Sequence, residues 1–177
     1  MEIIELINNG SKKLKNNRVL TNNLDAEILL SKVLNKTREE LLINLHQKIS
    51  EKKINSFKKL LKRRSLKEPV AYILKEKEFW SKKFIVNKNT LIPRPETELM
   101  VEKIVEIFKS KNIFILDIGT GSGCILLSIL SELENSNGIG LDVSKKAIKV
   151  AKANSKKLRL FRRTKFLNRC VEDIYNK

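Results

Sequence analysis

The sequence is poor in the residues that cross-link, kink or loosen a chain. Its 177 residues include two cysteines, three prolines, six glycines, one tryptophan and one histidine. Cys124 and Cys170 stand apart, without the spacing of a zinc site, and two cysteines do not make the disulfide framework of a small secreted domain. We therefore expect a cytoplasmic protein with reduced thiols and no bound metal.

Long apolar runs are also missing. No stretch reaches the roughly 18 apolar residues that a membrane-spanning helix requires. The first ten residues, MEIIELINNG, contain two acids and no basic residue, which is not typical of a signal peptide. Hydrophobic residues make up 41% and charged residues 32% of the chain, a globular composition. We expect no membrane partner.

Acidic residues are scarce beside basic ones: 20 against 37, which gives a net charge of +17. Such an excess is typical of proteins that bind nucleic acid. However, 28 of the basic residues are lysine, and Asn (17) and Ile (20) are also abundant, a mixture typical of AT-rich codon usage. One local feature stands out, because residues 145–169 contain eleven Lys and Arg and no acid. We interpret it as a solvated helix face with a loop; a basic partner surface is the alternative.

Residues 1–66 are typical of a small helical bundle. Apolar residues recur at helical spacing in four segments. Thr37 and Glu40 fit a capping box at the start of the third. After Pro69, residues 71–86 lose this period and are rich in aromatic and β-branched residues, which predicts a hairpin. We expect Phe79 and Trp80 to pack it against a neighbouring domain.

Five of the six glycines lie between Gly119 and Gly140. The apolar run 113–118 predicts a buried parallel strand that ends around Asp117, and a helical run follows Gly123. A second strand, 138–141, leads to Asp142. A strand, a glycine turn and a helix in this order form the setting of a cofactor-binding loop, and a following acid can accept hydrogen bonds from ribose hydroxyls.

The glycine spacing indicates which cofactor. A dinucleotide loop has the pattern G-x-G-x-x-G, whereas this chain has D-x-G-x-G-x-G, which is typical of S-adenosylmethionine binding. That cofactor carries no phosphate, so a carboxylate such as Asp117 near the loop does not repel it. Asp117 can instead face its cationic methionine portion. The loop residues expected in the site are Gly119, Thr120, Gly121, Ser122 and Gly123.

Two segments make the assignment more specific: LIPRPETE at 91–98 and LDIGTGSG at 116–123. Together with Glu68-Pro69-Val70-Ala71-Tyr72 and Asp142, they resemble the release-factor glutamine methyltransferases (the PrmC/HemK family). The resemblance implies an α/β protein with a helical bundle that recognises release factors (1–66), a β-hairpin linker (67–92) and the first part of a Rossmann-like methyltransferase domain (93–177). It implies methylation of the glutamine amide in the GGQ motif of release factors, with S-adenosylmethionine as cofactor.

The resemblance also implies site residues beyond the glycine loop and Asp142. The segment with Pro93, Arg94, Pro95 and Thr97 would lie over the cofactor, although for Glu98 we prefer the role of a rigid helix start. Asp173 and Ile174 would flank the adenine.

The chain departs from the family in two ways. Lys67 and Lys75 stand where relatives usually have glycine, which puts the local turn geometry in question. The catalytic motif N-P-P-Y occurs nowhere in the 177 residues. We therefore expect no catalytic residue here and an inactive fragment, truncated before that motif, whose first strand is an open sheet edge.

Two other functions stay open. One is methylation of exocyclic amines in nucleic acid, which uses the same cofactor fold; the LIPRPETE segment and the bundle argue against nucleic acid as direct substrate. The other is a non-catalytic module that binds release factors.

Overall fold

The computed structural model describes residues 1–172 and contains two compact units. The first is Met1–Leu74 and the second begins at Lys75. Each unit has its own hydrophobic core.

The first unit is helical, as the sequence predicts. Thr37 caps α3: its Oγ1 accepts a hydrogen bond from Glu40 N at 3.2 Å, and Thr37 N donates to Glu40 Oε2 at 2.7 Å. The predicted capping box is therefore confirmed. The helices are α1 (Ile3–Asn16), α2 (Asn22–Leu34), α3 (Arg38–Ile43), α4 (Glu51–Ser65) and α5 (Val70–Leu74).

The predicted hairpin over 71–86 is wrong at its start. Val70–Leu74 forms α5, in which Ile73 is buried in the core of the helical unit. The N–H groups of Tyr72 and Ile73 donate to Pro69 O, so the proline starts a helical turn and does not merely end the bundle. The compact helical unit therefore extends eight residues beyond the expected limit at residue 66. Burial of Ile73 decides the local structure over its β-branched character.

The hairpin itself is shorter and tightly turned. Strands β1 (Glu76–Phe79) and β2 (Lys82–Ile85) are antiparallel. Trp80 and Ser81 form the two-residue turn with φ of 51° and 53°, the backbone of a type I′ turn. Phe79 is buried in the core of the second unit, and Trp80 packs against that core. The expected packing of the hairpin is confirmed.

Lys67 and Lys75 adopt left-handed backbone conformations, with φ of 67° and 61°. These are the two positions at which the resemblance leads one to expect glycine. A side chain in this region costs about 1–2 kcal/mol because its Cβ approaches the following carbonyl. Both turns therefore have a backbone conformation that glycine favours, although lysine occupies the position.

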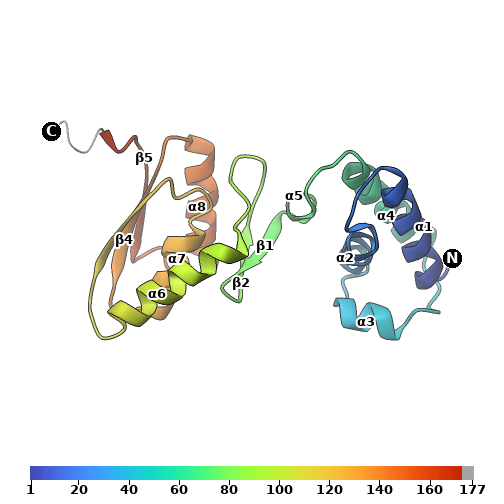
Figure 1. Cartoon of the computed structure of the whole chain (residues 1–177), viewed down its shortest axis with the longest axis horizontal. Helices are drawn as coiled ribbons and strands as arrows, with labels where there is room; N and C mark the ends of the chain where they lie inside the picture. The colour runs from blue at the N-terminus through green and yellow to red at the C-terminus, as the bar shows by residue number, and fades with distance from the viewer. Residues whose placement is uncertain (173–177) are drawn as a thin grey trace. The chain divides into compact units, whose positions relative to one another are not determined.

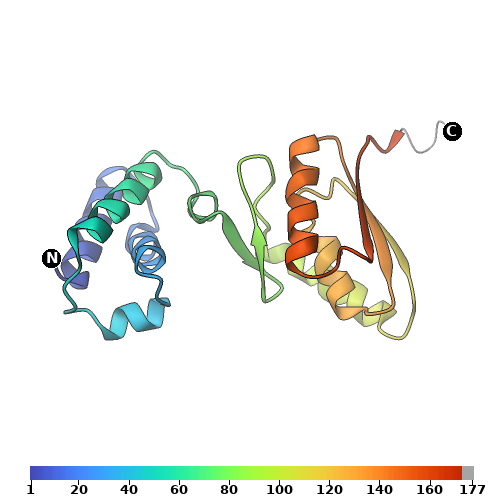
Figure 2. The ribbon, with the colours of Figure 1, turned by 180° about the vertical axis from the view of Figure 1, so that it is seen from behind.

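The second unit contains a parallel three-stranded sheet in the order β3-β4-β5. Its strands are β3 (Phe114–Ile118), β4 (Asn137–Asp142) and β5 (Thr164–Asn168). After the short helix η1 (Pro95–Thr97), the chain forms α6 (Glu98–Phe108), and α7 (Cys124–Glu132) and α8 (Lys145–Lys157) connect the strands. These three helices lie on one side of the sheet (Figures 1 and 2). The α/β fold class is confirmed.

The expectation that β3 is a buried strand is wrong for one of its faces. Phe114, Leu116 and Ile118 are 67%, 46% and 56% exposed, whereas Ile115 packs against the core. In the described part of the chain β3 pairs with β4 alone, so it is the predicted edge strand. An apolar run thus marks the strand correctly but does not show whether both of its faces are covered.

Among residues 1–172, no helix is both long and apolar enough to cross a membrane.

Candidate cofactor site

The glycine loop joins the carboxyl end of β3 to the start of α7. Gly119, Gly121 and Gly123 have φ of 74°, 55° and 79°, a region that L side chains rarely adopt. Thr120 N donates to Leu141 O at 2.8 Å, and Gly123 N donates to Thr120 O at 2.7 Å. The loop is therefore tied to β4 and turned tightly, as the predicted strand–loop–helix sequence requires.

Two glycines of this loop serve different purposes. A Cβ on Gly123 would lie 3.1 Å from Leu127 Cδ1 and 3.3 Å from Phe166 Cζ, so this glycine lets the loop pack on the core. A Cβ on Gly119 would have no neighbouring heavy atom within 4 Å. The Gly119 end of the loop therefore borders open space, where a ligand can approach the backbone.

Asp142 lies beside this loop, at the carboxyl end of β4. Its Oδ2 accepts a hydrogen bond from Gly121 N at 2.9 Å, and its Oδ1 accepts one from Ser144 N at 2.8 Å. A carboxylate offers about four acceptor positions, so each oxygen keeps a free lone pair. The structure thus brings Asp142 and the loop together as predicted, and Asp142 can still accept two hydroxyls.

Asp117 is the second acid of the site. Thr120 Oγ1 donates to Asp117 Oδ2 at 2.6 Å. Burial raises the pKa of the Asp117 carboxyl above its ordinary value of 3.8; the hydrogen bond from Thr120 acts in the opposite direction, and the nearby Asp142 adds to the increase. Two carboxylates next to one loop create a negative potential that favours a cationic ligand group.

The spacing of Ala147, Ala151 and Asn154 is part of the resemblance to the family, but the sequence assigned no role to Asn154, which is fully buried in α8. Its Oδ1 accepts from Ile85 N at 2.6 Å, and its Nδ2 donates to Ile85 O at 3.0 Å and to Ser122 O at 2.9 Å. One carboxamide therefore holds β2 and the glycine loop on α8. A polar residue on the apolar face of α8, in line with Ala147 and Ala151, is the sequence pattern that could have indicated it.

The segment expected over the cofactor lies at the start of α6. Pro93 is buried, Arg94 and Pro95 are exposed, and Thr97 N donates to Arg94 O at 3.0 Å. Within residues 1–172 no hydrogen bond links this segment to the glycine loop. Glu98 Oε1 accepts from Trp80 N at 2.8 Å, which fits the structural role preferred for it. Asp173 and Ile174 lie outside the described residues.

A parallel sheet with a glycine loop after its first strand and an acid after its second defines a cofactor-binding α/β domain. The spacing D-x-G-x-G-x-G of the loop is typical of the methyltransferase class among such domains. The family comparisons agree with this class. Residues 109–177 match a family described as a methyltransferase domain, and residues 5–74 match the PrmC N-terminal domain. The resemblance to release-factor glutamine methyltransferases is therefore confirmed.

Individual relatives of the chain are also named methyltransferases. The chain is 45% identical over 134 residues to a release factor glutamine methyltransferase of Buchnera aphidicola from Acyrthosiphon pisum, covering 76% of this chain and 48% of that protein. It is 44% identical over 172 residues to a bifunctional methyltransferase of Rickettsia prowazekii, covering 86% and 33%. The chain thus spans about a third to a half of the length of these relatives.

Among solved structures, the chain is similar to the N-terminal domain of human METTL16 in complex with SAH. The identity is 23%, the TM-score is 0.41, and the match covers 50% of this chain and 37% of that one. A likeness this distant carries no argument about the function of this chain.

Proposed function

We propose that this chain forms the release-factor-binding and cofactor-binding part of an S-adenosylmethionine-dependent methyltransferase that acts on the glutamine amide of the GGQ motif. The observation that carries the proposal is the hydrogen bond from Gly121 N to Asp142, because it puts a carboxylate that can accept hydroxyls next to a loop of three left-handed glycines. The matches to the PrmC N-terminal domain and to the Buchnera enzyme support the substrate class.

The residues of the site fit this cofactor. The open side of the loop at Gly119 admits a ligand close to the backbone, and no phosphate has to be accepted next to two carboxylates. In this proposal Asp142 binds the ribose hydroxyls, and Asp117 faces the cationic methionine portion. The cover segment with Pro93, Arg94, Pro95 and Thr97, and Asp173 and Ile174 at the adenine, complete the proposed set.

When bound, the cofactor would supply an electrophilic methyl group on its sulfonium. The glutamine amide is a poor nucleophile, so its nitrogen must be held in line with that methyl group, and good alignment contributes roughly 7–11 kcal/mol to lowering a barrier. In the resembled family the N-P-P-Y motif provides this alignment, and the 177 residues contain no copy of it.

The helical unit is proposed to recognise the release factor. It has a groove of about 410 Å³ between α1 and α4, lined in part by Leu6, Gly10, Phe57 and Leu61, with Lys13 and Lys58 also in its lining. An apolar floor with basic side chains beside it fits a protein partner. Because release factors work in translation, we place the protein in the cytoplasm.

Methyl transfer by an extended chain tests the function. The 177 residues would be joined to the remaining C-terminal part of the Buchnera relative and incubated with radiolabelled S-adenosylmethionine and either release factor, DNA or RNA. We expect label on the GGQ glutamine, identified by mass spectrometry, and a release factor with GGA in place of GGQ as control stays unlabelled. Label in DNA or RNA but not in release factor would instead support methylation of exocyclic amines.

Binding without transfer would support the third function, a non-catalytic module. In that case the extended chain captures release factor in a pull-down, and no label is transferred to any of the three substrates.

A further inference from the structure

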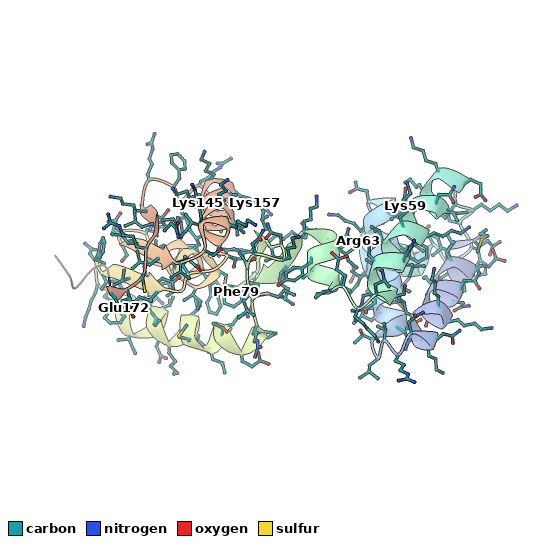
Figure 3. The ribbon with its side chains drawn as sticks, turned by 90° about the horizontal axis from the view of Figure 1, so that it is seen from above. Lys59, Arg63, Phe79, Lys145, Lys157 and Glu172 are labelled. Carbon is teal, nitrogen blue, oxygen red and sulfur yellow. The ribbon has the colours of Figure 1, made fainter. Side chains whose placement is uncertain are left out.

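The exposed side of α8 and the turn after it carry a dense positive charge, which we call the basic face. All its residues are exposed. Figure 3 labels Lys145 and Lys157, the first and last residues of α8. The basic face consists of Lys145, Lys146, Lys149, Lys152, Lys156 and Lys157 of α8, with Arg159, Phe161 and Arg162 of the turn.

The geometry of α8 puts these charges together. The opposite side of the helix is buried, with Ala147, Ile148, Ala151 and Asn154 in the unit's interior. A helix of 13 residues is about 20 Å long, and residues three or four apart form one row along it. Lys145, Lys149, Lys152 and Lys156 follow that spacing, so the six lysines share one side.

In the part of the chain that the structure describes, no acid forms a salt bridge with the basic face. Its sequence segment contains no Asp or Glu, and among residues 1–172 none of its Lys and Arg side chains forms a salt bridge. The basic residues at the end of α4 differ in this respect, because Arg63 pairs with Glu68 and Arg64 with Asp25. The positive potential of the basic face is therefore available to a partner.

An aromatic ring lies within this charge. Phe161 is 53% exposed, and the guanidinium carbon of Arg162 lies 5.9 Å from the centroid of its ring. A single exposed apolar side chain is common. An exposed ring between Arg159 and Arg162, next to six lysines without a salt bridge to any residue of 1–172, is also the combination on which unpaired bases stack while their phosphates are neutralised.

We propose that the basic face binds single-stranded nucleic acid, as a docking surface and not as a methyl acceptor. An acidic protein would also be attracted by the charge, but protein interfaces have an apolar core and few lysines. The basic face offers one apolar side chain among eight cationic ones, whereas nucleic-acid interfaces are polar and strongly positive. The proposal does not depend on the cofactor or on the release factor.

Fluorescence anisotropy with labelled oligo(U) RNA and oligo(dT) DNA tests the proposal, over a range of salt concentrations. Each neutralised phosphate contributes a slope of about −0.7 in a plot of log affinity against log salt for single strands. In the variant K149Q/K152Q/K156Q we expect the slope to become shallower by about 2. The matched control K52Q/K59Q/K62Q removes the same charge from exposed positions on α4 and should leave the slope unchanged.

The ring has a test of its own. Phe161→Ser should weaken binding of both oligonucleotides about fivefold or more, whereas Phe161→Tyr should retain it, since base–ring stacking is lost in the first and kept in the second. Circular dichroism would show that the variants remain folded. If both lysine triples lose the same affinity, binding depends on the net charge of the protein and not on the basic face, and the proposal is overturned. Tighter binding of an acidic peptide than of oligo(U) would overturn it in favour of a protein partner.

Discussion

Asp142 and Gly121, 21 positions apart in the sequence, are joined by a hydrogen bond of 2.9 Å from the Gly121 N–H to Asp142 Oδ2. The pairing of β3 with β4 makes this contact, because parallel strands in register end at the same edge of the sheet. The acid therefore ties the loop to the end of β4, and each of its oxygens keeps a lone pair that could accept a ribose hydroxyl in the proposed site.

Replacement of Asp142 by alanine should weaken binding of S-adenosylhomocysteine to the 177-residue chain. The expected loss is roughly 1.5–3 kcal/mol, the range for a hydrogen bond with a charged group. Isothermal titration calorimetry measures it, with Glu134→Ala as a control at an exposed acid of the same unit. If affinity is unchanged in Asp142→Ala, Asp142 does not belong to the cofactor site.

Asp117→Asn should raise the stability of the protein at neutral pH and weaken its binding of the cofactor. Because burial raises the pKa of Asp117 in the folded state, the folded protein holds this proton more tightly than the unfolded chain does. Ionisation of Asp117 therefore lowers the free energy of unfolding. This loss is absent below the ordinary pKa of 3.8, grows as the pH rises, and is complete above the folded-state pKa. Asparagine avoids that loss and can still accept from Thr120.

Urea unfolding should therefore show a higher free energy of unfolding for Asp117→Asn at neutral pH and no gain below pH 3.8. Affinity for S-adenosylmethionine should fall at the same time, because the negative charge proposed to face its cationic methionine portion is lost. A gain in stability that persists unchanged into acid would show that its cause is not the ionisation of Asp117.

Asn154→Ala should destabilise the second unit by about 3 kcal/mol, because it leaves buried backbone groups of Ile85 and Ser122 without partners. Asn154→Asp should also destabilise it, since a carboxylate accepts from Ile85 N but cannot donate to the two carbonyls. Chemical unfolding monitored by Trp80 fluorescence measures both, with Asn135→Ala as a surface control. Wild-type stability in Asn154→Asp would mean that the donor side of the amide contributes nothing.

Glycine in the left-handed turns should stabilise the protein. Lys75→Gly removes the unfavourable energy of a side chain in a left-handed conformation, about 1–2 kcal/mol. The greater conformational entropy of glycine in the unfolded chain offsets about 0.5–1 kcal/mol of this gain. The net gain expected in urea unfolding is therefore up to about 1.5 kcal/mol, with a central value of about 0.75 kcal/mol. The same substitution in a right-handed setting, Lys152→Gly in α8, should cost about 1 kcal/mol. Equal effects at both positions would contradict a conformational cause.

The residues differ in how well the sequence predicts them. The glycine loop and Asp142 follow from local patterns, because an apolar strand, a turn and an acid at the end of the next strand are each visible in a few residues. The helix at Val70–Leu74 and the exposed face of Phe114, Leu116 and Ile118 depend on which surface covers a residue, and that information is not local. The contacts of Asn154 join residues 69 and 32 positions away, which no short pattern contains.

The 177-residue chain by itself should bind S-adenosylhomocysteine but transfer no methyl group to release factor. The loop and Asp142 can hold one side of the cofactor, whereas no residue of an N-P-P-Y motif is present to align the glutamine nitrogen. Since alignment is worth roughly 7–11 kcal/mol, its loss should abolish detectable turnover. Within residues 1–172, β3 has an open edge as well as an exposed apolar face, and both should also make this chain poorly soluble when expressed alone. A tritiated-methyl assay measures transfer beside the chain extended with N-P-P-Y. Comparable turnover of the two would show that residues within these 177 do the aligning, and would move the search for catalytic residues to the loop and to Arg94.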